Sequence, residues 1–188
     1  AISEITENGI IDESGKLHEV DAIIYGTGFY TTTYKHLYEV KGIGNNSLFE
    51  KWNSEGGEAY YGMTVSGFPN FLLMVGPNTG LGHNSIVHMM ESQLNYIMGY
   101  LKYLDNNPNS ALNVKETVQN EFNQKIQQQL KTMIWSDGGC NSYYLKDSNG
   151  KNTSIWPGST MSYRKQTKRI NKTDYDIVSI ETTKKELI

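Results

Sequence analysis

Glycines and small polar residues follow an apolar run in the middle of the chain. The run is Phe71 to Val75, short enough to be a strand buried on both faces. The turn after it reads Gly76-Pro77-Asn78-Thr79-Gly80-Leu81-Gly82. Three glycines leave its backbone bare, so this stretch could bind a ligand through backbone N–H groups and nearby polar side chains.

A helix is expected directly after the turn. Apolar residues recur there at helical spacing and predict one buried face: Ile86, Met90, Leu94, Ile97, Leu101 and Leu104. The pattern is therefore strand, glycine-rich turn and helix N-terminus. Because the first N–H groups of a helix lack partners and lie at its positive end, an anionic or electron-rich ligand is expected above the turn.

The first part of the chain is expected to be a small β unit. Ile2 to Thr6 reads as a strand, Asn8 and Gly9 favour a hairpin, and Leu17 to Val20 is extended. Asp21 to Tyr25 is predicted to be another strand that ends at Gly26, Thr27 and Gly28. These three residues are typical of a tight turn, although they would also allow a close backbone approach to a ligand.

Residues 30–67 are expected to form an ordered connection over the surface. A short helical turn from Ser47 to Trp52, with Ser47 as its N-cap, is predicted within it. Tyrosines and threonines gather between Tyr30 and Tyr38, where they either pack the loop or line a substrate site.

A second helix and a hairpin are expected after Asp105 to Ser110. Asn113 and Glu116 have capping-box spacing, and an apolar face continues from Val118 through Leu130. Strands at 141–145 and 154–156 are predicted around an Asn-Gly turn. The last segment, 164–188, has seven Lys/Arg against four Asp/Glu and is expected to be a solvated basic tail, or one that contacts a phosphate-bearing ligand.

Composition limits the classes of function. With 188 residues and a net charge of −3, the chain is expected to be globular, with no nucleic-acid partner. No apolar run approaches the roughly 20 residues of a membrane span, and no signal peptide is recognised. Cys140 is the single cysteine, and together these features predict a cytoplasmic protein. Neither paired carboxylates for acid–base catalysis nor metal-ligand spacing is found. The chain begins without Met in what reads as mid-strand, so we expect a piece of a longer protein.

Three motifs together resemble those of flavin-containing and Baeyer–Villiger-type monooxygenases. Asp21 to Phe29 resembles the family's D-x-(I/V)-(I/V)-x-A-T-G-F motif, with Gly26 in place of Ala. Gly67 to Ser85 resembles its G-F-P-N-L-F…G-P-N-T-G-L-G-H-N-S segment. Trp135 to Gly158 resembles the closing W…C-x-S-W-Y…W-P-G signature, with Tyr143 where Trp is common. The resemblance extends from near residue 2 to about 165.

The resemblance implies the C-terminal portion of a two-dinucleotide-binding-domain flavoprotein, an α/β, Rossmann-like fold. The G-x-G-x-x-G loops for FAD and NADPH and the Baeyer–Villiger fingerprint are absent from the chain. Residues 1–29 would end the NADPH-binding domain and form the inter-domain junction. Residues 30–165 would belong to the FAD-binding domain, and residues 166–188 would be the basic tail.

The activity implied by this resemblance is insertion of one oxygen atom from O2 into a small organic ketone, through a C4a-peroxyflavin. FAD and NADP would be the cofactors. The cofactor-binding residues would be Gly26, Thr27, Gly28, Gly76, Pro77, Asn78, Thr79, Gly80, Leu81 and Gly82, with no catalytic residue among them. Asn78 and Thr79 would reach the flavin rim, and Asn84 and Ser85 would cap the helix. Oxygenation of an amine or sulfide, or a stand-alone ligand-binding module, are the alternatives. Because the N-terminal part of the longer enzyme is missing from this chain, the chain alone is expected to be inactive. It is also expected to self-associate or to remain partly unordered.

Overall fold

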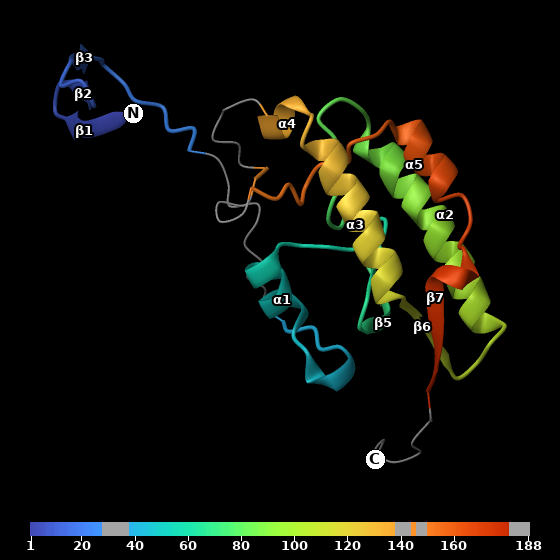
Figure 1. Cartoon of the computed structure of the whole chain (residues 1–188). Helices are drawn as coiled ribbons and strands as arrows, with labels where there is room; N and C mark the ends of the chain where they lie inside the picture. Colours follow the sequence, from blue (N-terminus) through green and yellow to red (C-terminus); the bar gives the residue numbers. More distant parts are fainter. Residues whose placement is uncertain (28–37, 138–143, 146–149, 181–188) are drawn as a thin grey trace.

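The computed structural model describes residues 1–27, 38–137, 144–145 and 150–180 as an α/β arrangement of small antiparallel sheets and helices (Figure 1). The strands are β1 (Ile2–Thr6), β2 (Gly9–Asp12), β3 (Leu17–Glu19), β4 (Thr64–Val65), β5 (Phe68–Leu72), β6 (Ser110–Val114) and β7 (Tyr175–Ser179). The helices are α1 (Leu48–Glu55), α2 (Ile86–Asp105), α3 (Glu116–Leu130), α4 (Ile134–Asp137) and α5 (Thr160–Gln166), with single 3₁₀ turns at Ile43–Asn45 and Lys172–Asp174.

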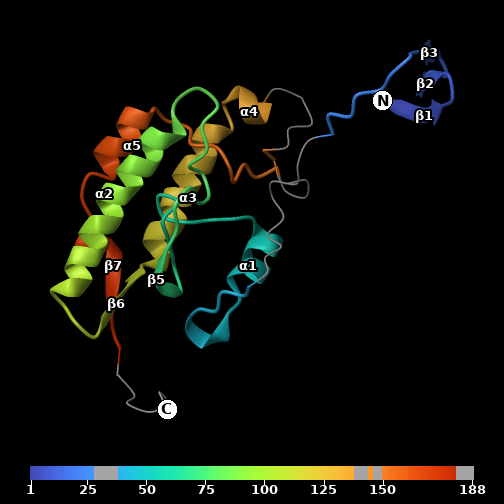
Figure 2. The same ribbon diagram turned by 180° about the vertical axis from the view of Figure 1, so that it is seen from behind.

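The N-terminal sheet follows the prediction, but the strand expected after it does not form. β1 and β2 pair around the turn at Asn8, and β3 adds to β2. Both views show this sheet apart from the helices (Figures 1 and 2). Asp21 to Tyr25 has no regular structure, and the Ile24 side chain is 95% exposed. The prediction is wrong because a strand needs a hydrogen-bonded neighbour, and the described part of the chain supplies none there.

The long helix α2 forms where predicted, but it buries a different face. Its fully buried positions are Met89, Ser92, Gln93, Tyr96 and Tyr100. Most of the predicted apolar face lies outside, with Leu94 49% and Leu101 45% exposed. The tyrosine face of α2 is buried instead, because each tyrosine buries a large ring and also has a hydrogen-bond partner for its hydroxyl group. The Tyr96 hydroxyl lies 2.7 Å from that of Tyr175, for example.

The next helix begins later than its sequence signal indicates. Asn113, predicted as part of a capping box, lies in β6, and α3 begins at Glu116 without a side-chain cap. Asn113 instead accepts a hydrogen bond from the Gly67 N–H group through its side-chain oxygen, at 2.8 Å. The predicted apolar face of α3 is confirmed, since Ile126 and Leu130 are buried.

Two further strand predictions need correction. The central strand is β5, earlier than Phe71 to Val75; it is only half-buried and pairs antiparallel with β4. In the predicted C-terminal hairpin, Leu145 and Asn152 form one antiparallel bridge. Residues 141–143 and 146–149 of this hairpin lie outside the described part of the chain.

The segment predicted as a solvated basic tail is largely part of the fold. Residues 160–166 form α5, which packs on α2, and β7 pairs with β6 along its whole length. Tyr175 in β7 is 4% exposed and belongs to the main core. The sequence did not predict this strand because it is short. Its few apolar residues follow a segment rich in lysine and arginine, which indicated a solvated tail.

Three clusters of buried side chains hold the elements together. One lies under α2, β6 and β7 and includes Tyr96, Tyr100 and Tyr175. A second joins α2, α3 and α5 through Met89, Leu130 and Trp156 together with their neighbours. The third packs α1 against β4 and β5. Ser47 accepts the N-cap hydrogen bond of α1 from the Glu50 N–H group at 3.4 Å, as predicted. No helix among the described residues is both long and apolar enough to cross a membrane.

Candidate functional site

The glycine-rich turn lies between β5 and α2 and is held by the segment 152–156. The Gly80 N–H group donates to the Ser154 carbonyl at 2.8 Å, and the Trp156 N–H group donates to the Gly80 carbonyl at 2.8 Å. Gly80 and Ile155 thereby form a parallel bridge. Two motifs about 75 residues apart in sequence are therefore one structural unit, and the turn is fixed by backbone hydrogen bonds.

The Asn78 and Thr79 side chains face inward and hold the turn from behind. Asn78 is 3% exposed, and its Nδ2 donates to the Asn152 carbonyl at 2.8 Å and to the Ile155 carbonyl at 3.1 Å. Thr79 is fully buried, and its Oγ1 donates to the Gly76 carbonyl at 2.6 Å. Their side chains therefore position the turn and do not extend to an outer rim, where they were expected.

The glycines in the turn are required by neighbours in the protein. A Cβ at Gly80 would lie 2.7 Å from the Ser154 carbonyl oxygen, and one at Gly82 would lie 2.5 Å from the Trp135 ring. Such distances are far below van der Waals contact. The sequence predicted that these glycines let a ligand approach the backbone. In the structure, their missing side chains are needed so that neighbouring parts of the same chain can pack closely.

The N-terminus of α2 is open. Ser85 occupies its N-cap position, yet its side chain makes no capping hydrogen bond. Asn84, also expected to cap, accepts from the Ser85 N–H group at 2.7 Å and donates to Thr160 Oγ1 at 3.1 Å. In the described residues the N–H groups of Leu81, Gly82 and His83 donate no hydrogen bond. Residues 82–87 are exposed, so these donors and the positive end of α2 are accessible to a ligand.

An apolar cavity of about 380 Å³ lies beside the turn. Gly76, Pro77 and Gly80 line it, together with aromatic and aliphatic side chains: Tyr38, Phe49, Trp52, Phe71, Leu73, Met74 and Val75. The Phe49 and Trp52 rings meet edge to face with centroids 6.3 Å apart. The sequence predicted a short helical turn that ends at Trp52 and did not single out Phe49. Their spacing of three on a short helix was the signal that both point to one side.

Val75, which lines this cavity, has an unusual backbone. Its φ is 55°, a left-handed conformation that β-branched residues rarely adopt. The Val75 N–H group donates to Gln93 Oε1 at 3.0 Å, and Gln93 is fully buried in α2. The helix thus holds the strained end of the apolar run, which also explains why the strand stops at Leu72.

The structure does not bring Gly26 and Thr27 to this turn. Gly26 and Thr27 lie in the exposed segment after β3, and a Cβ at Gly26 would meet nothing within 4 Å. Gly28 lies outside the described residues. Leu81 and Gly82 do belong to the open edge of the turn, next to Trp135.

Several buried tyrosines of the core have raised pKa values. Burial raises the pKa of Tyr175 to about 12, and burial likewise raises the pKa values of Tyr96 and Tyr163 well above the usual range. Tyr163 donates to the Tyr61 carbonyl at 2.6 Å. These hydroxyl groups stay protonated at neutral pH and act as structural hydrogen-bond partners. The described residues contain no group of three or more His, Cys, Asp or Glu suited to a metal ion.

Comparison with known proteins decides the family. The chain is 42% identical over 178 residues to a Baeyer–Villiger monooxygenase of Pseudomonas aeruginosa and 39% identical to one of Streptomyces coelicolor. The chain belongs to the Baeyer–Villiger-type flavoprotein monooxygenases. It spans about 34% of the length of these relatives, while 95% and 94% of the chain is matched. No protein-family model matches it.

Solved structures agree with the α/β fold of a monooxygenase segment. Cyclohexanone monooxygenase from Rhodococcus sp. Phi1 bound to NADP+ superposes with a TM-score of 0.69 at 23% identity, over 95% of this chain and 34% of that one. OTEMO in complex with FAD and NADP gives 0.71 at 24% identity, over 94% and 33%. At these identities the similarity shows the fold alone, and it confirms the predicted fold class.

Proposed function

We propose that this protein works as part of an FAD- and NADPH-dependent oxidoreductase that inserts one oxygen atom of O2 into a small organic ketone. The observation that carries the proposal is the 42% identity to a relative named Baeyer–Villiger monooxygenase, over almost the whole chain. The alternative is oxygenation of an amine or a sulfide. A stand-alone binding module is less well supported, because relatives of this name extend well beyond the matched region.

The open edge of the turn fits a flavin. Bound FAD would supply the electron-transfer and oxygen chemistry, and its reduced ring is electron-rich. The unbonded N–H groups of Leu81 to His83 and the N-terminus of α2 would donate to it. A helix end contributes about 0.3–1 kcal/mol to such an anion, and up to about 2 when partly buried. Gly76, Pro77 and Gly80 would shape the turn, and Asn78 and Thr79 would keep it rigid from behind.

The cavity beside the turn suits the apolar part of a substrate or cofactor. Its walls are mainly aromatic and aliphatic, and it shares Gly76, Pro77 and Gly80 with the turn. Small organic ketones are largely apolar, so this chemistry agrees with the proposed substrate class. Gly26, Thr27 and Gly28 remain proposed for the junction between the two nucleotide-binding domains, as their motif suggests.

A further part of the enzyme would cover the exposed face of α2. This apolar stripe consists of Ile86, Val87, Met90, Leu94, Met98 and Leu101, each at least 37% exposed. Ile24 and Tyr25 are exposed as well, at 95% and 70%. The relatives contain about twice as much additional sequence as this chain, which would supply the missing cover. Without it we propose that the chain is inactive and self-associates. A cytoplasmic location and the absence of a nucleic-acid partner remain part of the proposal.

A chimera tests the activity. This chain would replace the matching third of the Pseudomonas aeruginosa relative, and NADPH oxidation and products would be measured with a panel of ketones, amines and sulfides. Conversion of a ketone to an ester or lactone is the expected result. N- or S-oxides without ester formation would favour the alternative. A folded chimera that oxidises no substrate would refute the proposed function.

A further inference from the structure

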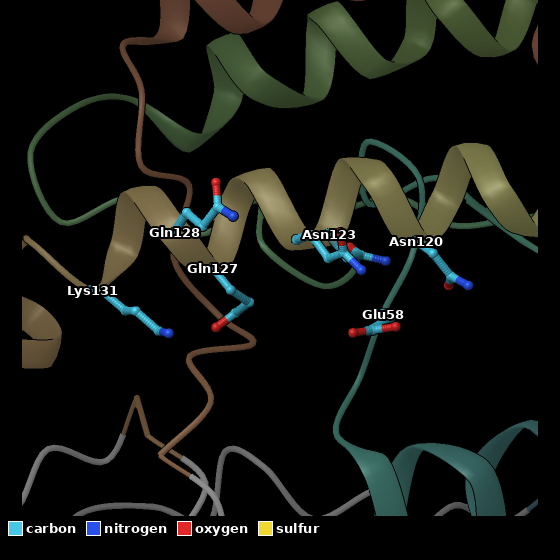
Figure 3. Close-up of a pocket in the computed structure, with 7 residues that line it drawn as sticks. Glu58, Asn120, Asn123, Gln127, Gln128 and Lys131 are labelled. Carbon is cyan, nitrogen blue, oxygen red and sulfur yellow. The ribbon is translucent and has the colours of Figure 1, made fainter.

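A second cavity, of about 320 Å³, lies between α3 and the irregular segment after α1 that carries Glu58 (Figure 3). None of its lining residues lines the cavity beside the turn. Figure 3 shows several of these side chains on the side of α3 that faces Glu58, with Gln128 pointing the other way. The residues that matter here are Glu58, Asn120, Asn123, Gln124, Gln127 and Lys131.

Asn123 is the unusual member of this set. Its side chain is 3% exposed, and neither Nδ2 nor Oδ1 has a hydrogen-bond partner in the described chain. Buried side-chain amides are almost always paired, because losing water without a replacement partner is costly. A buried amide that lines a cavity with both its donor and its acceptor unused therefore points to a ligand.

The charged residues around Asn123 indicate that the ligand is neutral. Glu58 is ion-paired with Lys151, so its charge is already compensated. Lys131 is exposed and lies at the C-terminal end of α3, where the helix dipole disfavours an anion. Gln127 Nε2 donates to the Asn152 carbonyl at 2.8 Å, which fixes one wall of the cavity. What remains available is a row of carboxamide groups on one helix face, at spacings of three and four residues.

We propose that this amide cavity binds a neutral molecule with adjacent hydroxyl groups, of the size of one sugar ring. A carboxamide can donate to one hydroxyl and accept from its neighbour, which would satisfy both unused atoms of Asn123 at once. The Glu58 carboxylate, on the opposite side, would accept a hydrogen bond from a further hydroxyl group. The volume is at the lower end of known ligand sites, which favours a single small ring. This site is independent of the proposed flavin function.

The test follows the Asn123 side-chain NH2 resonances by ¹⁵N NMR during titration of the chain with D-ribose and, separately, with AMP. A saturable shift at millimolar ribose is expected and indicates a free sugar. A shift with AMP alone would overturn the proposal, because ribose offers adjacent hydroxyl groups without the phosphate charge. No saturable shift with either probe overturns the proposal and leaves a water-filled cavity.

Variants separate binding from folding. Asn123→Leu should weaken ribose binding roughly tenfold or more, because it removes both donor and acceptor; the side-chain NH2 resonances of Asn120, which also lines the cavity, then report the binding. Gln124→Leu, at an exposed lining position, should also weaken binding without affecting folding. Gln129→Leu lies on the same helix outside the cavity and serves as the matched control. Unchanged affinity in folded Gln124→Leu together with Asn123→Leu would overturn the proposal.

Discussion

Replacing Asn78 with alanine should destabilise the whole turn. Asn78 has a φ of 56°, and alanine in this left-handed conformation costs about 1 kcal/mol. The Ile155 carbonyl would lose its Asn78 donor, and a buried unsatisfied carbonyl costs about 1–3 kcal/mol. The Asn152 carbonyl would still accept a hydrogen bond from Gln127, so losing its hydrogen bond from Asn78 should cost little. We therefore expect the free energy of unfolding to fall by about 3 kcal/mol.

Matched variants at Asn78 and Asn45 separate the two contributions. Asn45 has a similar φ of 63° on an exposed turn, so Asn45→Ala measures the backbone cost alone. Asn78→Gly keeps the backbone freedom and removes only the hydrogen bonds. Asn78→Asp should be worst, because a carboxylate would face two carbonyl oxygens. Urea unfolding followed by tryptophan fluorescence gives each value. If Asn78→Ala costs no more than Asn45→Ala, the turn is not held as described.

Three further changes probe other parts of the chain. Gly82→Ala should cost about 1–3 kcal/mol and alter the near-UV signal of Trp135, whereas Gly26→Ala, which has open space, should be close to neutral in the same unfolding assay. Because burial raises the folded-state pKa of Tyr175 to about 12 from about 10 unfolded, its contribution to stability is complete below pH ~10 and is lost as the pH rises toward 12. Alkaline unfolding should show this loss, and Tyr175→Phe should remove part of the pH slope. Leu94→Glu, in the exposed stripe of α2, should reduce self-association in sedimentation without lowering thermal stability. A wild-type chain that sediments as a monomer would contradict the last expectation.

The sequence correctly predicted those elements that are determined by interactions between residues close together in the chain. The Asn8 hairpin, the Ser47 cap and the length of α2 depend on turn chemistry and helical periodicity, and all three are present. The orientation of α2 was not predictable in this way. Its apolar stripe and its tyrosine face have the same period, and only tertiary hydrogen bonds such as that between Tyr96 and Tyr175 decide which one is buried.

The place of the glycine-rich turn before α2 was predicted, but the orientation of its side chains was not. Motif spacing located the turn from Gly76 to Gly82, yet the inward orientation of Asn78 depends on residues 152–156, far away in sequence. The strand predicted at Asp21 to Tyr25 failed for the related reason that strands need neighbours. The aromatic wall from Phe49 and Trp52 likewise needed the fold to bring α1 beside the turn.

FAD titration of the isolated chain and of the chimera with the Pseudomonas aeruginosa relative tests the central proposal most directly. The turn and the α2 N-terminus would form one side of a flavin site whose other side lies in the remaining two-thirds of the enzyme. We expect stoichiometric quenching of flavin fluorescence by the chimera and no saturable binding by the chain alone. A folded chimera that binds no FAD, or tight binding by the isolated chain, would contradict this account.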